Sequence, residues 1–150
     1  MKCVEAKSIE GFETVLQSFY DTHQSGRFGL DVRIEDVADE LEVLINGTMT
    51  TVFILVSEKM IAGFIGVVLF KSPTGKDIIA NEKFWYVMPE YRGYSLKLFR
   101  KAKSWAKDHG ASHFISNASM LASNLHDKIC KIYEAFGMEK FETSYIKKLR

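Results

Sequence analysis

Residues 87–95 of this 150-residue chain read Val-Met-Pro-Glu-Tyr-Arg-Gly-Tyr-Ser, and this stretch is the most informative one for predicting the fold. An apolar run precedes them and a strongly periodic helical segment follows, with Pro89 at the boundary. A strand that stops at proline, turns through Arg92 and Gly93 and becomes a helix brings unpaired backbone N–H groups to the positive end of a helix dipole. Such a spot suits a phosphate group, so the stretch predicts a phosphate-binding turn.

Upstream of this turn, the spacing of apolar residues predicts one strand, two helices and then three further strands. Apolar residues recur at helical spacing over residues 12–19 and 34–45, and Asn46-Gly47 ends the second helix. Alternating or β-branched runs predict the strands, which are expected over residues 2–7, 50–56, 61–70 and 78–88.

Downstream of the turn, Ser95 is expected to cap a helix that ends at Gly110. A short strand over residues 113–118, a helix over Ser123–Phe136 and a closing strand over Phe141–Leu149 follow. The element order βααβββαβαβ predicts an α/β (α+β) fold in a single domain over residues 1–150.

The charge of the chain is divided between its two parts. Residues 1–50 hold 4 Lys and Arg against 10 Asp and Glu, and residues 51–150 hold 16 against 9, so net charges of −6 and +7 almost cancel. The acidic part would suit a cationic acceptor and the basic part a polyanionic cofactor. Ordinary solvated helix faces would explain any single charge equally well.

The cysteine count and the hydropathy indicate a cytoplasmic protein. Cys3 and Cys130 are the only cysteines and cannot form a disulfide framework, and no signal peptide precedes the fold. The most hydrophobic span, residues 52–70, is interrupted at residues 57–59, which leaves runs of about ten residues, too short to cross a bilayer. We therefore expect no membrane partner.

A second helical segment carries Tyr133 and ends at Gly137-Met138. It places a phenol opposite the phosphate-binding turn if both segments follow neighbouring strands. A pyrophosphate site and a phenol across adjacent strand ends suggest acyl transfer from coenzyme A.

On these residues the chain resembles the GNAT family of N-acetyltransferases over most of its length. The family's acetyl-CoA loop reads Arg/Gln-x-x-Gly-x-Gly/Ala, commonly inside Val-x-Pro-Glu-Tyr-Arg-Gly, and residues 87–93 match this longer pattern residue for residue. The family also carries a tyrosine four residues before a Gly-Phe pair, matched here by Tyr133 and Gly137-Met138. The resemblance implies a mixed, mostly antiparallel sheet of six to seven strands flanked by four helices, with pantetheine lodged where two neighbouring strands part.

The chain departs from the family pattern in its cofactor loop. Ser95 and Lys97 stand where Gly or Ala usually lets the backbone approach the pyrophosphate, and His126 stands where the family often has Asn. GNAT-like proteins of tailed bacteriophages are similar in having a loosened Arg-Gly loop. Ser95 could donate to a phosphate, whereas Lys97 would either clash or contact a phosphate oxygen. No metal is expected, and the residues expected to hold acetyl-CoA are Val87, Met88, Arg92, Gly93, Tyr94, Ser95, Leu96, Lys97 and Tyr133.

Direct attack by a lysine-like amine requires a base, whereas an N-terminal amine hardly needs one. Deprotonating a lysine-like amine at pH 7 costs about 4 to 5 kcal/mol, against about 1 kcal/mol for an α-amino group. Glu82, on the strand before the turn, and His126 are the candidate bases, and relayed water could replace both.

Tyr133 is the candidate acid, because a phenol keeps its proton at neutral pH and can give it to the departing thiolate. Burial beside Ile129 and Phe136 would equally explain a tyrosine at this position. The N–H groups of Val87 or Met88, where the strand diverges, are expected to bind the thioester oxyanion.

The sequence leaves alternatives open. His126 and Cys130, four residues apart on one helix, could form a thiolate pair for acylation or bind a metal, although such a cysteine is usually a small buried hydrophobe. A GNAT-like shell without catalysis could act as a binding or inhibitory module. The basic segment 97–107 would suit nucleic acid, but it lacks interleaved aromatic residues and the acidic first third would repel phosphates.

The acceptor is expected to be an amine-bearing small molecule or a peptide or protein amine, and an exposed end strand would favour a homodimer.

Overall fold

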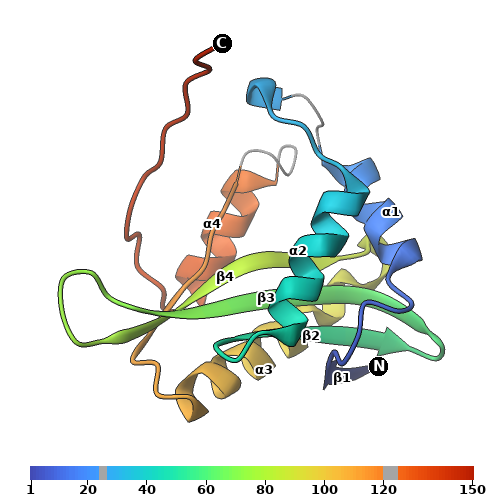
Figure 1. Ribbon diagram of the computed structural model, residues 1–150, viewed down its shortest axis with the longest axis horizontal. Helices are drawn as coiled ribbons and strands as arrows, with labels where there is room; N and C mark the ends of the chain where they lie inside the picture. Colours follow the sequence, from blue (N-terminus) through green and yellow to red (C-terminus); the bar gives the residue numbers. More distant parts are fainter. Residues whose placement is uncertain (24–26, 120–124) are drawn as a thin grey trace.

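The computed structural model of this chain describes residues 1–23, 27–119 and 125–150, and a twisted sheet forms its centre (Figure 1). Within the described residues the sheet has five strands in the order β1-β2-β3-β4-β5. Strands β1 to β4 pair antiparallel with their neighbours, and β5 pairs parallel with β4. The strands are β1 (Lys2–Glu5), β2 (Thr50–Ser57), β3 (Met60–Lys71), β4 (Ile78–Val87) and β5 (His113–Ile115).

Four α-helices form where apolar residues recur at helical spacing. Two short 3₁₀-helices, η1 (Arg27–Gly29) and η2 (Pro89–Tyr94), precede α2 and α3. The α-helices are α1 (Glu13–Thr22), α2 (Ile34–Asn46), α3 (Ser95–Asp108) and α4 (His126–Ala135).

Two hydrophobic clusters, one on each face of the sheet, hold these elements together. On one face, α1 and α2 pack on the sheet around Phe64, which is fully buried. On the other face, α3 packs through Leu98 and Ala102 against Leu55 and Ile65. Helix α4 joins the α3 side, because the rings of Phe136 and Phe99 stack with centroids 6.1 Å apart.

A β-bulge in β4 changes which side chains share a face of the sheet. Gly66 pairs with Phe84 and Val67 pairs with Glu82, so Lys83 is an extra residue in β4. Side chains three residues apart on a regular strand point to opposite faces. Here Trp85 stacks on Phe99 of α3, and Glu82 also lies on the α3 side, where it meets the segment after β5.

The structure confirms the predicted fold class, the four helices and the mostly antiparallel mixed sheet. The predicted total of six to seven strands is wrong, because residues 138–150 contain no strand. Phe141 and Tyr145 are 74% and 93% exposed, and no described strand pairs with the predicted closing strand Phe141–Leu149. Alternating apolar residues make a strand only where a sheet edge is available, and here the chain after α4 runs as an irregular segment to the C-terminus (Figure 1).

Several predicted boundaries shift. The strand after α3 ends at Ile115 rather than at residue 118, and α4 begins at His126, while the predicted start at Ser123 lies outside the described residues. Ser95 is the first residue of α3, and Tyr94 takes the preceding position with no side-chain cap. Because η2 runs directly into α3, the serine side chain is not at the capping position.

Gly63 gives a prediction about the end of β4. A Cβ atom built on Gly63 would lie 2.8 Å from both the Tyr86 carbonyl oxygen and Val87 Cγ2, so β3 and β4 approach closely there. Gly63→Ala should lower the free energy of unfolding by about 1 to 3 kcal/mol, because the crowded atoms include backbone. Urea denaturation measures the change. Gly75→Ala is the control, since a Cβ there has no atom within 4 Å, and equal effects of the two substitutions would contradict the prediction.

Candidate active site

Strand β5 pairs with only the first part of the longer β4, and this leaves an open edge beside the rest of β4. Residues Ile79 to Asn81 pair with His113 to Ile115, where β5 ends. Strand β4 continues to Val87, so its second half has β3 on one side and no strand on the other within the described residues. The site is built around this opening.

Asn117 crosses the opening just beyond the last paired residues. Its backbone N–H donates to Glu82 Oε2 at 2.7 Å, and its Nδ2 donates to the Glu82 carbonyl at 2.6 Å. The same Nδ2 lies 3.2 Å from Asn81 Oδ1. The Asn117 carbonyl accepts a hydrogen bond from the Tyr133 hydroxyl at 3.0 Å. One residue therefore links the candidate base and the candidate acid.

Glu82 is a buried carboxyl group with 6% of its surface exposed. Burial raises the pKa of this carboxyl from 4.5 to about 7, and the Asn117 N–H, which favours the charged form, limits the rise. A carboxyl group with a pKa near neutrality can exchange a proton at physiological pH, as a general base must.

Tyr133 projects from α4 toward the same opening, and its ring stacks on Trp85 with centroids 6.0 Å apart. Burial raises the pKa of the Tyr133 phenol above its ordinary value, and the charges of Glu82 and Cys130 raise it further, while the Ser116 hydroxyl opposes them. The phenol is therefore protonated at neutral pH, as a general acid must be.

The backbone donors at the end of β4 differ from the prediction in one respect. The Met88 N–H donates to the Ala62 carbonyl at 2.9 Å, so it is not free to bind an oxyanion. In an antiparallel pair, neighbouring residues direct their N–H groups to opposite sides, and the Val87 N–H therefore faces the open edge. Of the two predicted donors, Val87 is the one in position.

The predicted phosphate-binding turn is a 3₁₀-helix rather than a bare loop. The Tyr91 N–H donates to the Met88 carbonyl and the Ser95 N–H to the Arg92 carbonyl, so a phosphate finds fewer backbone donors here than the sequence predicts. Arg92 Nε lies 3.4 Å from the Val87 carbonyl. A Cβ built on Gly93 meets no atom within 4 Å, so the backbone stays accessible there.

Lys97 lies at the start of α3 but its side chain is directed to the N-terminus of the chain. Its Nζ donates to the Met1 carbonyl at 3.2 Å and sits 5.8 Å from the centre of the Tyr94 ring. Leu96 lies next to it in the first turn of α3. The roles predicted for these residues in cofactor binding stay predictions.

His126 lies at the beginning of α4, two helical turns before Tyr133. Its Nδ1 is 3.0 Å from Asp127 Oδ1 and its Nε2 is 3.8 Å from Cys130 Sγ. The structure thus brings Glu82 and Tyr133 together around Asn117, and gives His126 different partners.

Asn117 and Trp85 were missed by the sequence reasoning. Asn117 lies two residues after the end of β5, a usual place for functional side chains, but the strand predicted over residues 113–118 included it. The role of Trp85 depends on the bulge at Lys83, which the sequence does not reveal.

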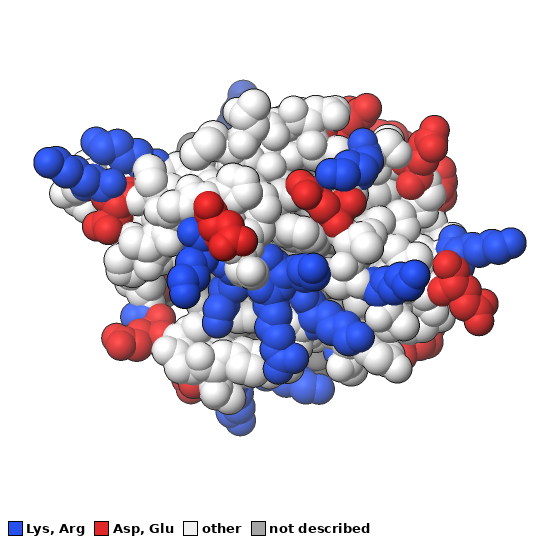
Figure 2. All heavy atoms as spheres, turned by 90° about the horizontal axis from the view of Figure 1, so that it is seen from below, with Lys and Arg blue, Asp and Glu red and all other residues white. Residues whose placement is uncertain are grey.

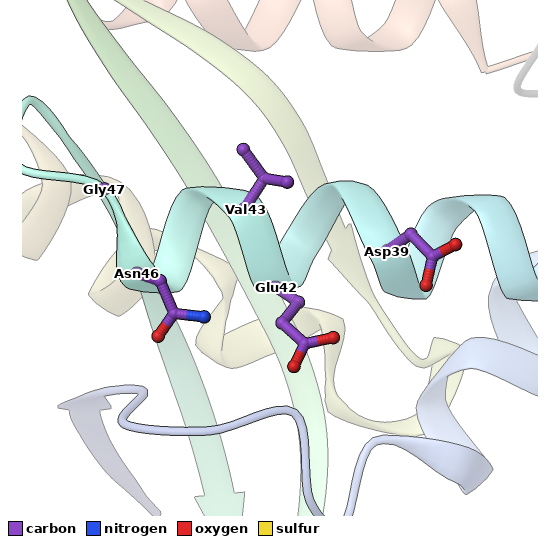
Figure 3. A pocket seen from close by; sticks show the side chains of 5 residues that line it. All are labelled: Asp39, Glu42, Val43, Asn46 and Gly47. Atoms are coloured by element: carbon purple, nitrogen blue, oxygen red, sulfur yellow. The ribbon is translucent and has the colours of Figure 1, made fainter.

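Two surface hollows lie outside the opening. One is on the outer face of α2, across the sheet from Tyr133, and is lined by Asp39, Glu42, Val43, Asn46 and Gly47 (Figure 3). The other lies between α1 and the end of β4 and is lined by Glu13, Thr14, Gln17, Ser18, Asp21 and Met88. Helix α1 packs on the same face of the sheet as α2, so the second hollow also lies on that face, and Met88, which follows β4 directly, brings it to the end of β4.

Positive charge gathers over α3. Figure 2 shows basic side chains grouped on this side of the molecule. The exposed basic residues of α3 are Lys97, Arg100, Lys101, Lys103 and Lys107. This surface, called here the basic face, would attract a polyanion toward the same side of the sheet as Tyr133.

Comparison with solved structures identifies the fold. A mutant Bacillus halodurans protein matches with a TM-score of 0.80 and 18% identity, covering all of both chains. A ribosomal-protein-alanine N-acetyltransferase from Brucella melitensis biovar Abortus 2308 matches with a TM-score of 0.73 and 14% identity over 99% of this chain and 100% of its own. An aminoglycoside 6'-N-acetyltransferase from Acinetobacter haemolyticus matches with a TM-score of 0.68 and 16% identity over 100% of this chain and 99% of its own.

A further acetyltransferase of the same aminoglycoside type, solved with a bisubstrate analogue that contains coenzyme A, has a TM-score of 0.64 and 15% identity over 99% of this chain and 97% of its own. No protein-family model matches the sequence, and no curated protein does. The chain has the GNAT acetyltransferase fold.

In the described part of the chain, no helix is both long and apolar enough to cross a membrane.

Glu82 gives a prediction about pH. The pKa of this carboxyl is 4.5 when unperturbed and about 7 in the folded protein. Between pH 4.5 and pH 7 the folded state therefore binds more protons than the unfolded state. The free energy of unfolding should therefore fall as the pH rises through this window, by about 3 kcal/mol for a shift of this size. Glu82→Gln should abolish this fall, which urea denaturation across the pH range would measure.

The exposed Glu90→Gln is the matched control and should keep the wild-type dependence. If Glu82→Gln and wild type showed parallel pH curves, Glu82 would not be the carboxyl with the raised pKa.

Proposed function

We propose that this chain, which has the fold of GNAT acetyltransferases, transfers an acetyl group from acetyl-CoA to a primary amine by direct attack. The observation that carries the proposal is the pairing of the buried Glu82 with the partly covered Tyr133, linked through Asn117 at the point where β4 and β5 separate. A base and an acid on either side of an open strand edge are what amine acylation requires.

The residues around the opening fit the acyl carrier. The Val87 N–H on the open edge is an amide donor for the thioester oxyanion, and backbone amides are effective donors to such an oxyanion. Gly93 leaves the backbone accessible near the start of α3, and the helix dipole favours an anion there. The basic face of α3 adds a long-range attraction for the carrier's phosphates.

Helix α4 turns a partly covered face toward the opening, from which Tyr133 reaches Asn117. None of its residues is fully buried, and its partly covered face carries His126, Ile129, Cys130 and Tyr133. A ligand between this face and β4 would cover side chains that the fold itself leaves half exposed. The set of residues predicted to hold acetyl-CoA, from Val87 to Lys97 with Tyr133, remains our proposal for its binding site.

Glu82 is the base that we propose. At neutral pH a carboxyl with a pKa of about 7 is partly deprotonated and can accept a proton from an ammonium group. Tyr133 would then donate its proton to the departing thiolate of coenzyme A. The two groups are held in place by the same residue, Asn117, so neither needs to move far during transfer.

A cationic amine is the acceptor that the surface favours. The hollow between α1 and Met88 carries the exposed carboxylates of Glu13 and Asp21 together with the Gln17 amide. Opposite charge would concentrate an ammonium group beside the end of β4. Peptide amines, polyamines and aminoglycosides share this chemistry.

Binding of acetyl-CoA tests the proposal first. At a hundredfold excess over Kd the carrier should stabilise the protein by about 2.7 kcal/mol, which is a rise in Tm of roughly 5 to 10 °C. No thermal shift at millimolar acetyl-CoA would reject the acetyltransferase and the cofactor-holding shell alike. A thermal shift without thiol release from any amine would favour the shell that binds without catalysis.

Tyr133→Phe tests the acid. It should lower kcat about tenfold or more in a thiol-release assay, while acetyl-CoA still raises the Tm. Tyr145→Phe is the control, because Tyr145 is 93% exposed on the chain after α4 and should not change kcat. An unchanged kcat in Tyr133→Phe would remove this residue from the mechanism.

The basic face favours nucleic-acid binding as a second candidate function. Each phosphate contact contributes about −0.9 to the slope of log Kobs against log salt concentration, so use of the basic face predicts a slope between about −3 and −5. Arg100→Glu should flatten this slope and Lys59→Glu, in the turn between β2 and β3, should not. A slope near zero for DNA and RNA would rule the second candidate out.

A further inference from the structure

The partly covered face of α4 carries more chemistry than the phenol. His126, Cys130 and Tyr133 follow one another at spacings of four and three residues, so an imidazole, a thiol and a phenol lie along one side of the helix. All three are partly covered, whereas their neighbours Asp127, Lys128, Lys131 and Glu134 are exposed. The proposed transfer uses only the phenol.

The imidazole lies between the thiol and a carboxylate. His126 Nε2 is 3.8 Å from Cys130 Sγ, within reach of a hydrogen bond to sulfur, and His126 Nδ1 is 3.0 Å from Asp127 Oδ1. With a proton on Nδ1, the ring donates to Asp127 and Nε2 can accept the proton of the thiol. A nucleophile next to a base that a third group orients is the arrangement that activates thiols.

The thiol also lies near the proposed reaction centre. Cys130 precedes Tyr133 by three residues on α4, so the two side chains are neighbours on one face of the helix. The Tyr133 hydroxyl in turn bonds to Asn117, next to Glu82. Cys130 therefore borders the opening between β4 and β5 where the thioester is proposed to lie.

We propose that Cys130 is an acyl-accepting thiol, which takes the acetyl group from acetyl-CoA when no amine occupies the acceptor hollow. This inference rests on the proposed function, since it uses the same thioester. It adds a modification site to the chain and a means of regulation, because an acetyl group on Cys130 would stand beside Tyr133 and obstruct the opening.

The step is a thioester exchange and needs no further reactant. His126 Nε2 takes the proton of Cys130, and the thiolate sulfur forms a bond to the carbonyl carbon. The bond from that carbon to the sulfur of coenzyme A breaks, and the departing thiolate takes up a proton from His126. One thioester is replaced by another, so coenzyme A in excess reverses the reaction.

Cys3 is the internal comparison. It lies on β1, where burial raises the pKa of its thiol and Lys101 and Lys97 partly offset that effect. No acid–base partner of the kind that His126 offers Cys130 lies beside it among the described hydrogen bonds. A merely accessible thiol and an activated one can therefore be compared within one protein.

The experiment follows the intact mass of the protein during incubation with acetyl-CoA in the absence of amine. In a Cys3→Ser background Cys130 is the only thiol, and we expect one acetyl group that hydroxylamine or excess coenzyme A removes. His126→Asn should slow its appearance about tenfold or more, since the base is lost. Cys130→Ser in that background should take up no acetyl group. Cys130 as the only thiol should also react with iodoacetamide faster than Cys3 does in a variant where Cys3 is the only thiol.

Three results would overturn the inference: no adduct although acetyl-CoA raises the Tm, an adduct on Cys3 alone, or an unchanged rate in His126→Asn. The small thioester S-acetyl-N-acetylcysteamine separates this inference from the proposed function, because it has no nucleotide to be held at η2. If acetyl-CoA fails to bind, acetylation of Cys130 by the small thioester, with the same dependence on His126, would still support the activated thiol. If the small thioester does not acetylate Cys130 either, the inference is rejected.

Discussion

The carboxyl group of Glu82 can carry a charge, yet it lies where water has little access, and the rest of the candidate site is arranged around it. A buried carboxylate is costly unless it is paired with a cation or well supplied with donors. Glu82 has no ion pair within the described residues, and its carboxylate receives a backbone N–H from Asn117. This partial compensation leaves the carboxyl with a pKa near neutrality, instead of holding it permanently charged or permanently neutral. The fold therefore accepts some loss of stability at the place where the proposed transfer would exchange a proton.

Two irregularities of β4 make that arrangement possible. The extra residue Lys83 places Glu82 and Trp85 on the same side of the sheet, although a regular strand would separate them. The early end of β5 then leaves the second half of β4 without a neighbour, so the Val87 N–H stays available. Each irregularity by itself would weaken a sheet. The two hydrophobic clusters, which pack β2 and β3 from both faces, supply the stability that allows both.

The sequence predicted what depends on local periodicity and failed where partners distant in sequence decide. Helices α1, α2 and α3 were predicted because their apolar stripes repeat along the chain, and the hairpin of β2 and β3 because of its β-branched runs. The strand predicted over Phe141–Leu149 has a similar pattern, but pairing also needs a free and suitably placed edge. The hydrogen bonds of the Tyr91 and Ser95 N–H groups within η2 could not be read from a Pro and Gly pattern. Asn117 was missed for the same reason, since its importance lies in contacts with residues about 35 positions away along the chain.

The division of charge along the sequence becomes a division in space. Seven of the ten acidic residues of the first third lie on α1 and α2, on one face of the sheet. The basic residues of α3 lie on the other face, which Figure 2 shows. Charges of opposite sign on one small domain would largely cancel at long range, so their separate placement matters only within about a Debye length of 8 Å. At that range an anionic carrier, as proposed, would be drawn to the α3 side and a cationic amine to the hollow beside α1. The end of β4 at Met88 lines the hollow beside α1, and the chain continues from there through η2 into α3, so the end of β4 joins the two surfaces at which the proposed amine and thioester would have to meet.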